Sequence, residues 1–145
     1  MREYITNSEE ETFAAAAEVA ALLKAGDVIL YKGEMGAGKT AFTKGIARYL
    51  EVDDEVTSPT FALVHEYTGK LPLFHFDLYR ISGYDDLYSI GFFDYLDRGG
   101  IIAAEWSENI PNLEEELSGV IRISIEKLSE NGRKITVSGG AFGGA

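Results

Sequence analysis

Residues 28–40 read VILYKGEMGAGKT, and this segment decides the expected fold. Its first four residues are a short apolar run, which suits a strand buried inside a sheet. Its last eight residues match the pattern G-x-x-x-x-G-K-[ST] at every fixed position. The following stretch, 39–50, then places Phe42, Ile46 and Tyr49 at helical spacing. A strand, a glycine-rich turn and an amphipathic helix in this order predict a phosphate-binding loop.

Each residue type in this loop has a chemical task. The glycines allow backbone N–H groups to turn inward around phosphate oxygens, and the helix N-terminus adds unpaired N–H groups and a positive dipole end. Lys39 is expected to contact the β- and γ-phosphates, and the Thr40 hydroxyl is expected to ligate Mg²⁺. The predicted nucleotide-binding residues are Gly33, Glu34, Met35, Gly36, Ala37, Gly38, Lys39 and Thr40. We therefore expect the loop to bind a purine nucleoside triphosphate, ATP with Mg²⁺.

Apolar patterns in the rest of the chain predict a mixed α/β fold. A helix is expected after Ser8, which is placed as its N-cap with Glu11 completing a capping box. Further strands are expected at 61–67, 71–76, 101–104, 120–125 and 135–137, and an aromatic-rich helical stretch, in one or two pieces, is expected at 84–96. Strand–helix–strand at the start favours a parallel sheet, and the two hairpins favour antiparallel strands beside it.

Composition bounds the class of protein. The 145 residues, 46% of them apolar, suit one domain, which we place at 1–138, followed by a flexible glycine-rich tail at 139–145. No apolar run approaches the roughly 18 residues of a membrane span, and the N-terminus has no signal-peptide core, so we expect a cytoplasmic protein. Cysteine is absent, which excludes disulfides and thiolate metal sites. The net charge is −11, with 13 basic residues scattered among 24 acidic ones, so direct nucleic-acid binding is not expected.

Two acidic residues end apolar runs that are expected to be strands. Asp77 ends the run 73–77, and Glu105 ends the run 101–105. Ligands gather at the carboxyl ends of parallel strands, so both side chains should reach the phosphates. We assign Asp77 to Mg²⁺, because its short arm suits a water-mediated contact, and Glu105 to the positioning or activation of water. The alternative is that one of them only caps a neighbouring helix.

Three residues near these acids allow two interpretations each. His75 lies on the same strand face as Asp77, and it either hydrogen-bonds in the site or is a satisfied structural histidine, which is the favoured interpretation. Trp106 is a core residue by default, with a contact near the nucleotide or a partner as the alternative. Arg80 either neutralises developing phosphate charge or forms an ordinary salt bridge.

Four segments together resemble the TsaE family, which is also called YjeE. They are the loop 33–40, the segment 57–67 (TSPTFALVHEY), the segment 75–80 (HFDLYR) and the pair Glu105 and Trp106. The resemblance implies a phosphate-loop NTPase fold with a central parallel sheet flanked by antiparallel strands. It also implies an ATPase that is weak alone and acts with the proteins TsaB and TsaD. Those two proteins carry the threonylcarbamoyl transfer to adenosine 37 of tRNA, and tRNA is expected to bind only the assembled complex.

The same resemblance implies roles for individual residues. Lys39 and Thr40 are implied to contact phosphate and Mg²⁺, Asp77 to be the metal-site acid and Glu105 the catalytic carboxylate. Thr60, in a polar loop fixed by proline, is implied to sense the γ-phosphate. The candidate catalytic residues are Glu105, Lys39 and Thr60, and the candidate metal residues are Thr40, Asp77 and Glu105.

Two other classes of protein share the phosphate loop. A small-molecule kinase usually carries an arginine-bearing lid, but only Arg98 lies in the long stretch 84–100, so no lid is evident. A GTP-driven switch recognises guanine through N-K-x-D, which the sequence lacks. The chain also departs from the family at Ser107, where a proline is frequent, and around 85–87, which leaves the partner-facing surface undefined.

Overall fold

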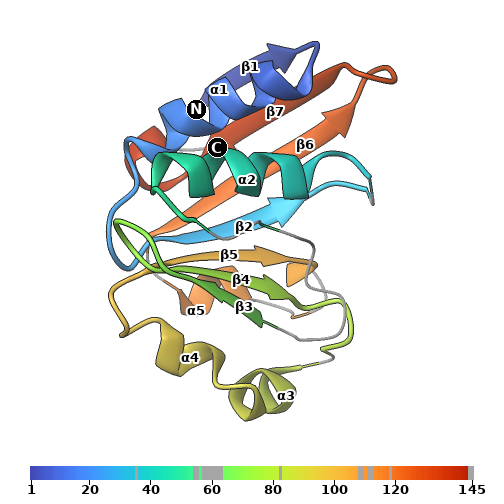
Figure 1. Cartoon of the computed structure of the whole chain (residues 1–145). Helices are drawn as coiled ribbons and strands as arrows, with labels where there is room; N and C mark the ends of the chain where they lie inside the picture. The colour runs from blue at the N-terminus through green and yellow to red at the C-terminus, as the bar shows by residue number, and fades with distance from the viewer. Residues whose placement is uncertain are drawn as a thin grey trace.

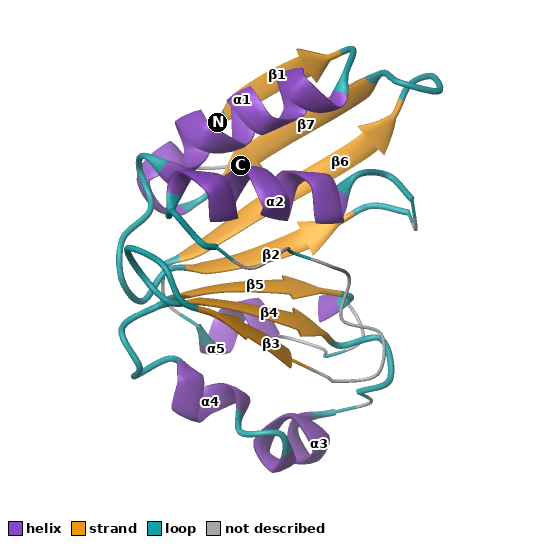
Figure 2. Cartoon of the chain, viewed as in Figure 1, coloured by secondary structure: helices purple, strands orange, loops and turns teal. Residues whose placement is uncertain are grey.

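The computed structural model describes residues 1–34, 36–53, 56, 64–81, 83–107, 110, 113–117 and 119–143. In this part of the chain one seven-stranded sheet carries helices on both faces (Figure 1, Figure 2). The strands are β1 (Arg2–Thr6), β2 (Val28–Lys32), β3 (Val64–Tyr67), β4 (Leu73–Asp77), β5 (Ile101–Glu105), β6 (Val120–Lys127) and β7 (Arg133–Ser138). The helices are α1 (Glu9–Ala20), α2 (Lys39–Tyr49), α3 (Tyr84–Ser89), α4 (Phe92–Tyr95), α5 (Leu113–Glu116) and the 3-10 helix η2 (Gly140–Phe142).

The strand order explains where a ligand site can form. The order is β1-β7-β6-β2-β5-β4-β3, in which β6, β2, β5 and β4 run parallel. The strands β7 and β1 on one side and β3 on the other are antiparallel to their neighbours. This arrangement confirms the expected fold class: an α/β fold with a central parallel sheet flanked by antiparallel strands. The carboxyl ends of β2, β4 and β5 therefore meet at one edge of the sheet.

Two apolar clusters hold the layers together. On one face α1 and α2 cover β2, β6 and β7, and side chains such as Val19, Phe42 and Ile123 are completely buried there. On the other face α3, α4 and α5 pack against β4 and β5 through Leu87, Phe92 and other apolar side chains. No helix among the residues that the structure describes is both long and apolar enough to cross a membrane.

Most of the expected elements are confirmed, and β1, α5 and η2 were not foreseen. The stretch 84–96 is divided into α3 and α4 at Gly91, whose φ of +78° ends the first helix. The strand β1 was missed because its sequence is mostly exposed and polar, so that only its pairing with β7 defines it. The helix α5, of four residues, was also missed. Residues 61–63 of the first expected hairpin lie outside the described residues.

The C-terminal segment differs from the flexible tail expected from residue 139. Gly140–Phe142 form the helix η2, and the Phe142 side chain is 6% exposed. The guanidinium of Arg2 lies 5.5 Å from its ring centroid, and the amino group of Met1 donates to its carbonyl oxygen. The glycine content pointed to flexibility, but one aromatic side chain anchors the segment in the core. Buried contacts therefore include Phe142, whereas the division into a domain at 1–138 and a tail stays a prediction.

Candidate active site

The loop between β2 and α2 depends on glycine at two positions. A Cβ at Gly33 would lie 2.5 Å from the carbonyl oxygen of Ile125 in β6, so only glycine allows the loop to pass this close to the sheet. Gly38 is the N-cap of α2 with a φ of +116°, which side-chain-bearing residues rarely adopt. The sequence pattern of the loop is therefore required by its backbone conformation. Met35 lies outside the described residues.

The first N–H groups of α2 have no acceptor among the residues that the structure describes. Gly38 provides no side-chain cap, and the first turn contains no acidic residue. The first helical hydrogen bond at this end runs from the Phe42 N–H to the Gly38 carbonyl oxygen at 2.9 Å. The N–H groups of residues 39–41 precede it and have no intrahelical acceptor. This end of the helix is consequently suited to an anion.

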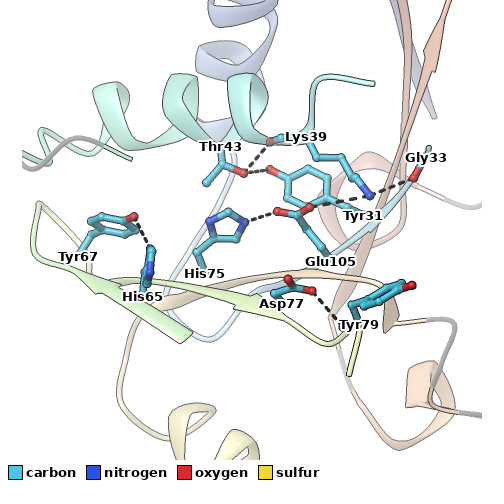
Figure 3. A network of polar contacts seen from close by, with 10 residues as sticks. All are labelled: Tyr31, Gly33, Lys39, Thr43, His65, Tyr67, His75, Asp77, Tyr79 and Glu105. Carbon is cyan, nitrogen blue, oxygen red and sulfur yellow. Dashed lines mark hydrogen bonds and ion pairs between the residues drawn. The ribbon is translucent and has the colours of Figure 1, made fainter. Parts of the chain in front are cut away.

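Lys39 lies over the loop and is 5% exposed. Its ammonium donates to the Gly33 carbonyl oxygen at 2.9 Å and lies 3.8 Å from Glu105 Oε1 (Figure 3). It also lies 4.4 Å from the centroid of the Trp106 ring. Trp106 has a φ of +65°, an unusual conformation for a bulky residue and one that occurs at functional sites. The half-buried Trp106 is thus in contact with the site as well as packed, and its ring meets that of Tyr79 at 5.2 Å.

The two predicted acids are neighbours across parallel strands. Asp77 and Glu105 end β4 and β5 and are paired in register, so their side chains emerge on the same face, as Figure 3 shows. Glu105 is 6% exposed, with Oε1 facing Lys39 and Oε2 bonded to His75 Nε2 at 2.6 Å. One oxygen of Asp77 accepts from the Tyr79 backbone N–H at 3.0 Å. The structure therefore brings Lys39, Glu105 and His75 into one chain of contacts and places Asp77 beside it.

Of the remaining predicted residues, those that the structure describes make no hydrogen bond or ion pair with Lys39, Glu105 or His75. Thr40 follows Lys39 in the first turn of α2 and is half-buried. Thr60 lies outside the described residues, so its role stays a prediction. Arg80 is exposed and forms no ion pair with the residues that are described, which leaves the salt-bridge interpretation without support.

Three buried polar residues that are absent from the lists of candidate site residues complete the site. His75 contacts Glu105, in agreement with the interpretation that was placed second. The Tyr31 hydroxyl bonds to Thr43 Oγ1 at 2.8 Å, and Thr43 donates to the Lys39 carbonyl oxygen at 2.9 Å. Burial raises the pKa of Tyr31; the Thr43 hydrogen bond opposes this rise and the charge of Glu105 adds to it. The spacing of Thr43 from Lys39, one helical turn, was the only sequence signal for these contacts.

The donor set fits a magnesium ion that is held together with phosphate. No three His, Asp or Glu side chains in the described part of the chain cluster as a cage for a metal ion. Mg²⁺ usually takes only one or two carboxylates and completes its shell with phosphate oxygens and waters. The second oxygen of Asp77 takes no hydrogen bond from the described residues, whereas both oxygens of Glu105 are engaged. Of the two acids, Asp77 therefore has the oxygen that is freer to take a metal ion.

One cavity is lined in part by the end of β2, Tyr31 included, and lies beside α5. It has a volume of about 630 Å³ and is lined by residues of β6, β7 and α5, among them Arg122, Ser124 and Leu113. Lys39, Asp77 and Glu105 do not line it. Cavity size by itself does not locate the site in this protein.

A phosphate-binding turn between a buried strand and an uncapped helix, with acids at two neighbouring strand ends, is the mark of phosphate-loop α/β proteins. Comparison with family models identifies the particular family. The model described as "Threonylcarbamoyl adenosine biosynthesis protein TsaE" matches residues 6–135. The chain belongs to the TsaE family.

Relatives along nearly the whole chain carry the name tRNA threonylcarbamoyladenosine biosynthesis protein TsaE. The Aquifex aeolicus protein is 42% identical over 140 residues, which cover 94% of this chain and 96% of that protein. The Bacillus subtilis protein is 41% identical over 133 residues, which cover 90% and 81% of the two chains. The Treponema pallidum protein is 35% identical over 134 residues, which cover 92% and 98%. The crystal structure of Bacillus subtilis YdiB matches with a TM-score of 0.73 and 36% identity, over 94% of this chain and 83% of that one.

Proposed function

We propose that this protein binds and hydrolyses Mg-ATP, and that its ATP cycle supports turnover of the TsaB–TsaD complex that makes N6-threonylcarbamoyladenosine at position 37 of tRNA. Family membership supports the pathway, because the relatives are named for threonylcarbamoyladenosine biosynthesis. One observation carries the nucleotide chemistry: the ammonium of Lys39 lies between the Gly33 carbonyl and Glu105 at the uncapped end of α2. No observation on the described residues favours the kinase or the GTP switch.

The loop is organised to bind phosphate before any ligand arrives. The N–H groups at the start of α2 supply donors at fixed positions, and Lys39 supplies a cation whose side chain is already ordered by burial and by Gly33. Little side-chain freedom remains to be lost on binding, which favours affinity. Asp77 and Thr40 are the residues that would hold Mg²⁺, which when bound neutralises charge on the phosphates.

Glu105 is placed to handle the attacking water. Its carboxylate is nearly buried and is held from both sides, by Lys39 and by His75. A carboxylate in this setting can accept a hydrogen bond from water and orient its oxygen to form a bond to the γ-phosphorus. The bond from that phosphorus to the β–γ bridging oxygen breaks, ADP leaves, and the proton of the water passes to the released phosphate. Partner proteins that shield this position from bulk water would raise the rate, since the chain has no evident arginine-bearing lid of its own.

The test is steady-state ATP hydrolysis by the purified chain with and without TsaB and TsaD. We expect slow turnover alone and a clear increase with both partners. A gel shift with tRNA is expected to show binding by the complex and none by the isolated acidic chain. A rate that the partners leave unchanged, together with tight tRNA binding by this chain alone, would contradict the partner-dependent model.

Two conservative variants separate the roles of the acids. Glu105→Gln should keep ATP bound while slowing cleavage, because its role lies in the transition state. Asp77→Asn should shift the Mg²⁺ dependence of ATP binding. If Glu105→Gln instead weakens ATP binding and leaves the rate of bound ATP intact, the two assignments are reversed.

A further inference from the structure

His75 is a completely buried polar residue that takes no direct part in the proposed chemistry, since its ring contacts Glu105. It lies in β4 between Phe74 and Phe76, and its own exposure is 0%. In the parallel pairing of β4 with β5 it stands opposite Ala103, two residues before Glu105. Residues two apart in a strand share a face, so the imidazole and the carboxylate lie on the same side of the sheet (Figure 3). The contact is His75 Nε2 to Glu105 Oε2 at 2.6 Å.

The surrounding contacts define the direction of this hydrogen bond. Glu105 Oε1 faces the ammonium of Lys39 at 3.8 Å, an arrangement that suits an ionised carboxylate. Such a carboxylate only accepts hydrogen bonds, so Nε2 of His75 carries the proton and donates. In the neutral ring Nδ1 is then an acceptor, and it has no partner among the residues that the structure describes. A buried acceptor without a partner is tolerated more readily than a buried N–H without one, which agrees with this tautomer.

A purely structural role accounts poorly for a histidine at this position. An apolar side chain of similar size would fill the same space without leaving a ring nitrogen unpaired, and unpaired buried polar atoms cost stability. Leu73, which lies two residues before His75 and so on the same strand face, is buried and apolar, so this face of the sheet does not require a polar residue here. Buried polar side chains with an unpaired atom break the rule that core positions are apolar or fully hydrogen-bonded, and such exceptions are concentrated at functional sites.

We propose that His75 is a positioning residue that holds the Glu105 carboxylate in its working orientation. A glutamate has three rotatable bonds, and a hydrogen bond to one oxygen fixes the direction of the other. Here the Nε2–H of His75 holds Oε2, which directs Oε1 toward Lys39 and the phosphate-binding loop. This inference rests on the proposed function, because the orientation of Glu105 affects turnover only if Glu105 acts in ATP hydrolysis.

Two amide substitutions distinguish positioning from packing. The side-chain nitrogen of glutamine stands near the place of Nε2, whereas that of asparagine stands near the place of Nδ1 and falls short of Glu105. His75→Asn is expected to lower kcat about tenfold or more, with KM changed less than about twofold, because orientation matters in the transition state. His75→Gln is expected to keep kcat within about threefold of the original protein, since the donor is retained.

His65 offers a matched control in the neighbouring strand. It stands directly opposite His75 in the β3–β4 pair, and its ring bonds to Tyr67 rather than to Glu105. His65→Gln is therefore expected to leave kcat unchanged. Equal losses in His75→Gln and His75→Asn, or no loss in either while Glu105→Gln is slow, would overturn the inference. A wild-type chain that hydrolyses no ATP even with its partners would instead contradict the proposed function.

A spectroscopic measurement tests the hydrogen bond without any change at His75. Nitrogen-15 NMR of the full chain reports which ring nitrogen carries the proton, and the sequence holds only two histidines, so His65→Gln assigns the signals. We expect the Nε2–H tautomer for His75. An Nδ1–H tautomer would overturn the inference even if the asparagine variant fails to fold.

Discussion

The helices α1 and α2 lie side by side on one face of the sheet (Figure 1). Their N-terminal N–H groups nevertheless differ, since side chains cap those of α1 and no side chain caps those of α2. At α1 the Ser8 hydroxyl accepts from the Glu11 N–H at 3.1 Å, and the Glu11 carboxylate accepts from the Asn7 N–H at 2.7 Å. Three glutamates fill its first turn. At α2 the cap is Gly38, the first residue is Lys39, and no acid follows in the first turn.

The difference shows how one chain uses the same backbone donors for two purposes. A helix end whose N–H groups meet its own side chains gains about 1 kcal/mol of stability. A helix end whose N–H groups stay unpaired lacks this stabilisation in the free protein. A ligand that binds only the folded state can supply it instead, because such binding raises the free energy of unfolding. Acids in the first turn would repel phosphate, so α1 is closed to anions by its sequence and α2 is open to them.

The largest effect is expected for Lys39→Ala, which removes the only side-chain cation in the first turn of α2. Turnover should fall about 10³-fold, and Mg-ATP affinity should also fall, because a desolvated charge contact to phosphate is lost. Calorimetric titration and steady-state hydrolysis measure the two effects. Lys44→Ala, further along the same helix, is the control and should change neither. Unchanged affinity and turnover in Lys39→Ala would remove the central claim of the proposed function.

The second prediction concerns the stability that α2 is expected to gain from its ligand. Mg-ATP at a free concentration one hundred times its dissociation constant should raise the free energy of unfolding by about 2.7 kcal/mol. Thermal or urea unfolding with and without Mg-ATP measures this. The gain should shrink sharply in Lys39→Ala at the same ligand concentration. An equal gain in both proteins would mean that the nucleotide binds elsewhere.

The third prediction transfers the acidic character of α1 to α2. Ala41→Glu places a carboxylate in the first turn of α2 and is expected to weaken Mg-ATP binding about tenfold through repulsion of phosphate. Ala41→Gln has nearly the same size without the charge and serves as the control. Equal affinities in the glutamate and glutamine variants would show that charge at this helix end does not decide binding.

The smallest effect is expected at α1. Ser8→Ala removes its N-cap and should lower the free energy of unfolding by about 1 kcal/mol, with Mg-ATP affinity unchanged. Ser89→Ala is a matched control, because its hydroxyl bonds to the Asp85 carbonyl oxygen within α3 and caps no N-terminus. Its effect on stability should be smaller. A loss of nucleotide affinity in Ser8→Ala would contradict the view that the N-terminus of α1 contributes to stability alone and that of α2 to nucleotide binding.

Local sequence was sufficient wherever neighbours along the chain supply the interaction. The residues of the capping box at Ser8 lie within four positions of one another. The loop 33–40 likewise contains its glycines, its lysine and the first residue of the helix within eight positions. The hairpins and the central strands follow from apolar runs separated by turn residues. The N-terminal strand Arg2–Thr6 does not, because a polar edge strand is defined by its partner β7. Phe142 likewise anchors its segment through residues distant in sequence.

The fold class, the phosphate loop and the two acids at strand ends could be predicted from local patterns, because period and spacing reflect which face of an element is buried and where each strand stops. How these residues meet depends on the pairing of the strands in three dimensions. The register of β4 against β5 sets Asp77 beside Glu105 and brings His75 within bonding distance of it. A shift of one residue in that register would turn His75 and Asp77 to the opposite face. The apolar pattern along one strand does not specify the polar contacts between two, since register belongs to the pair.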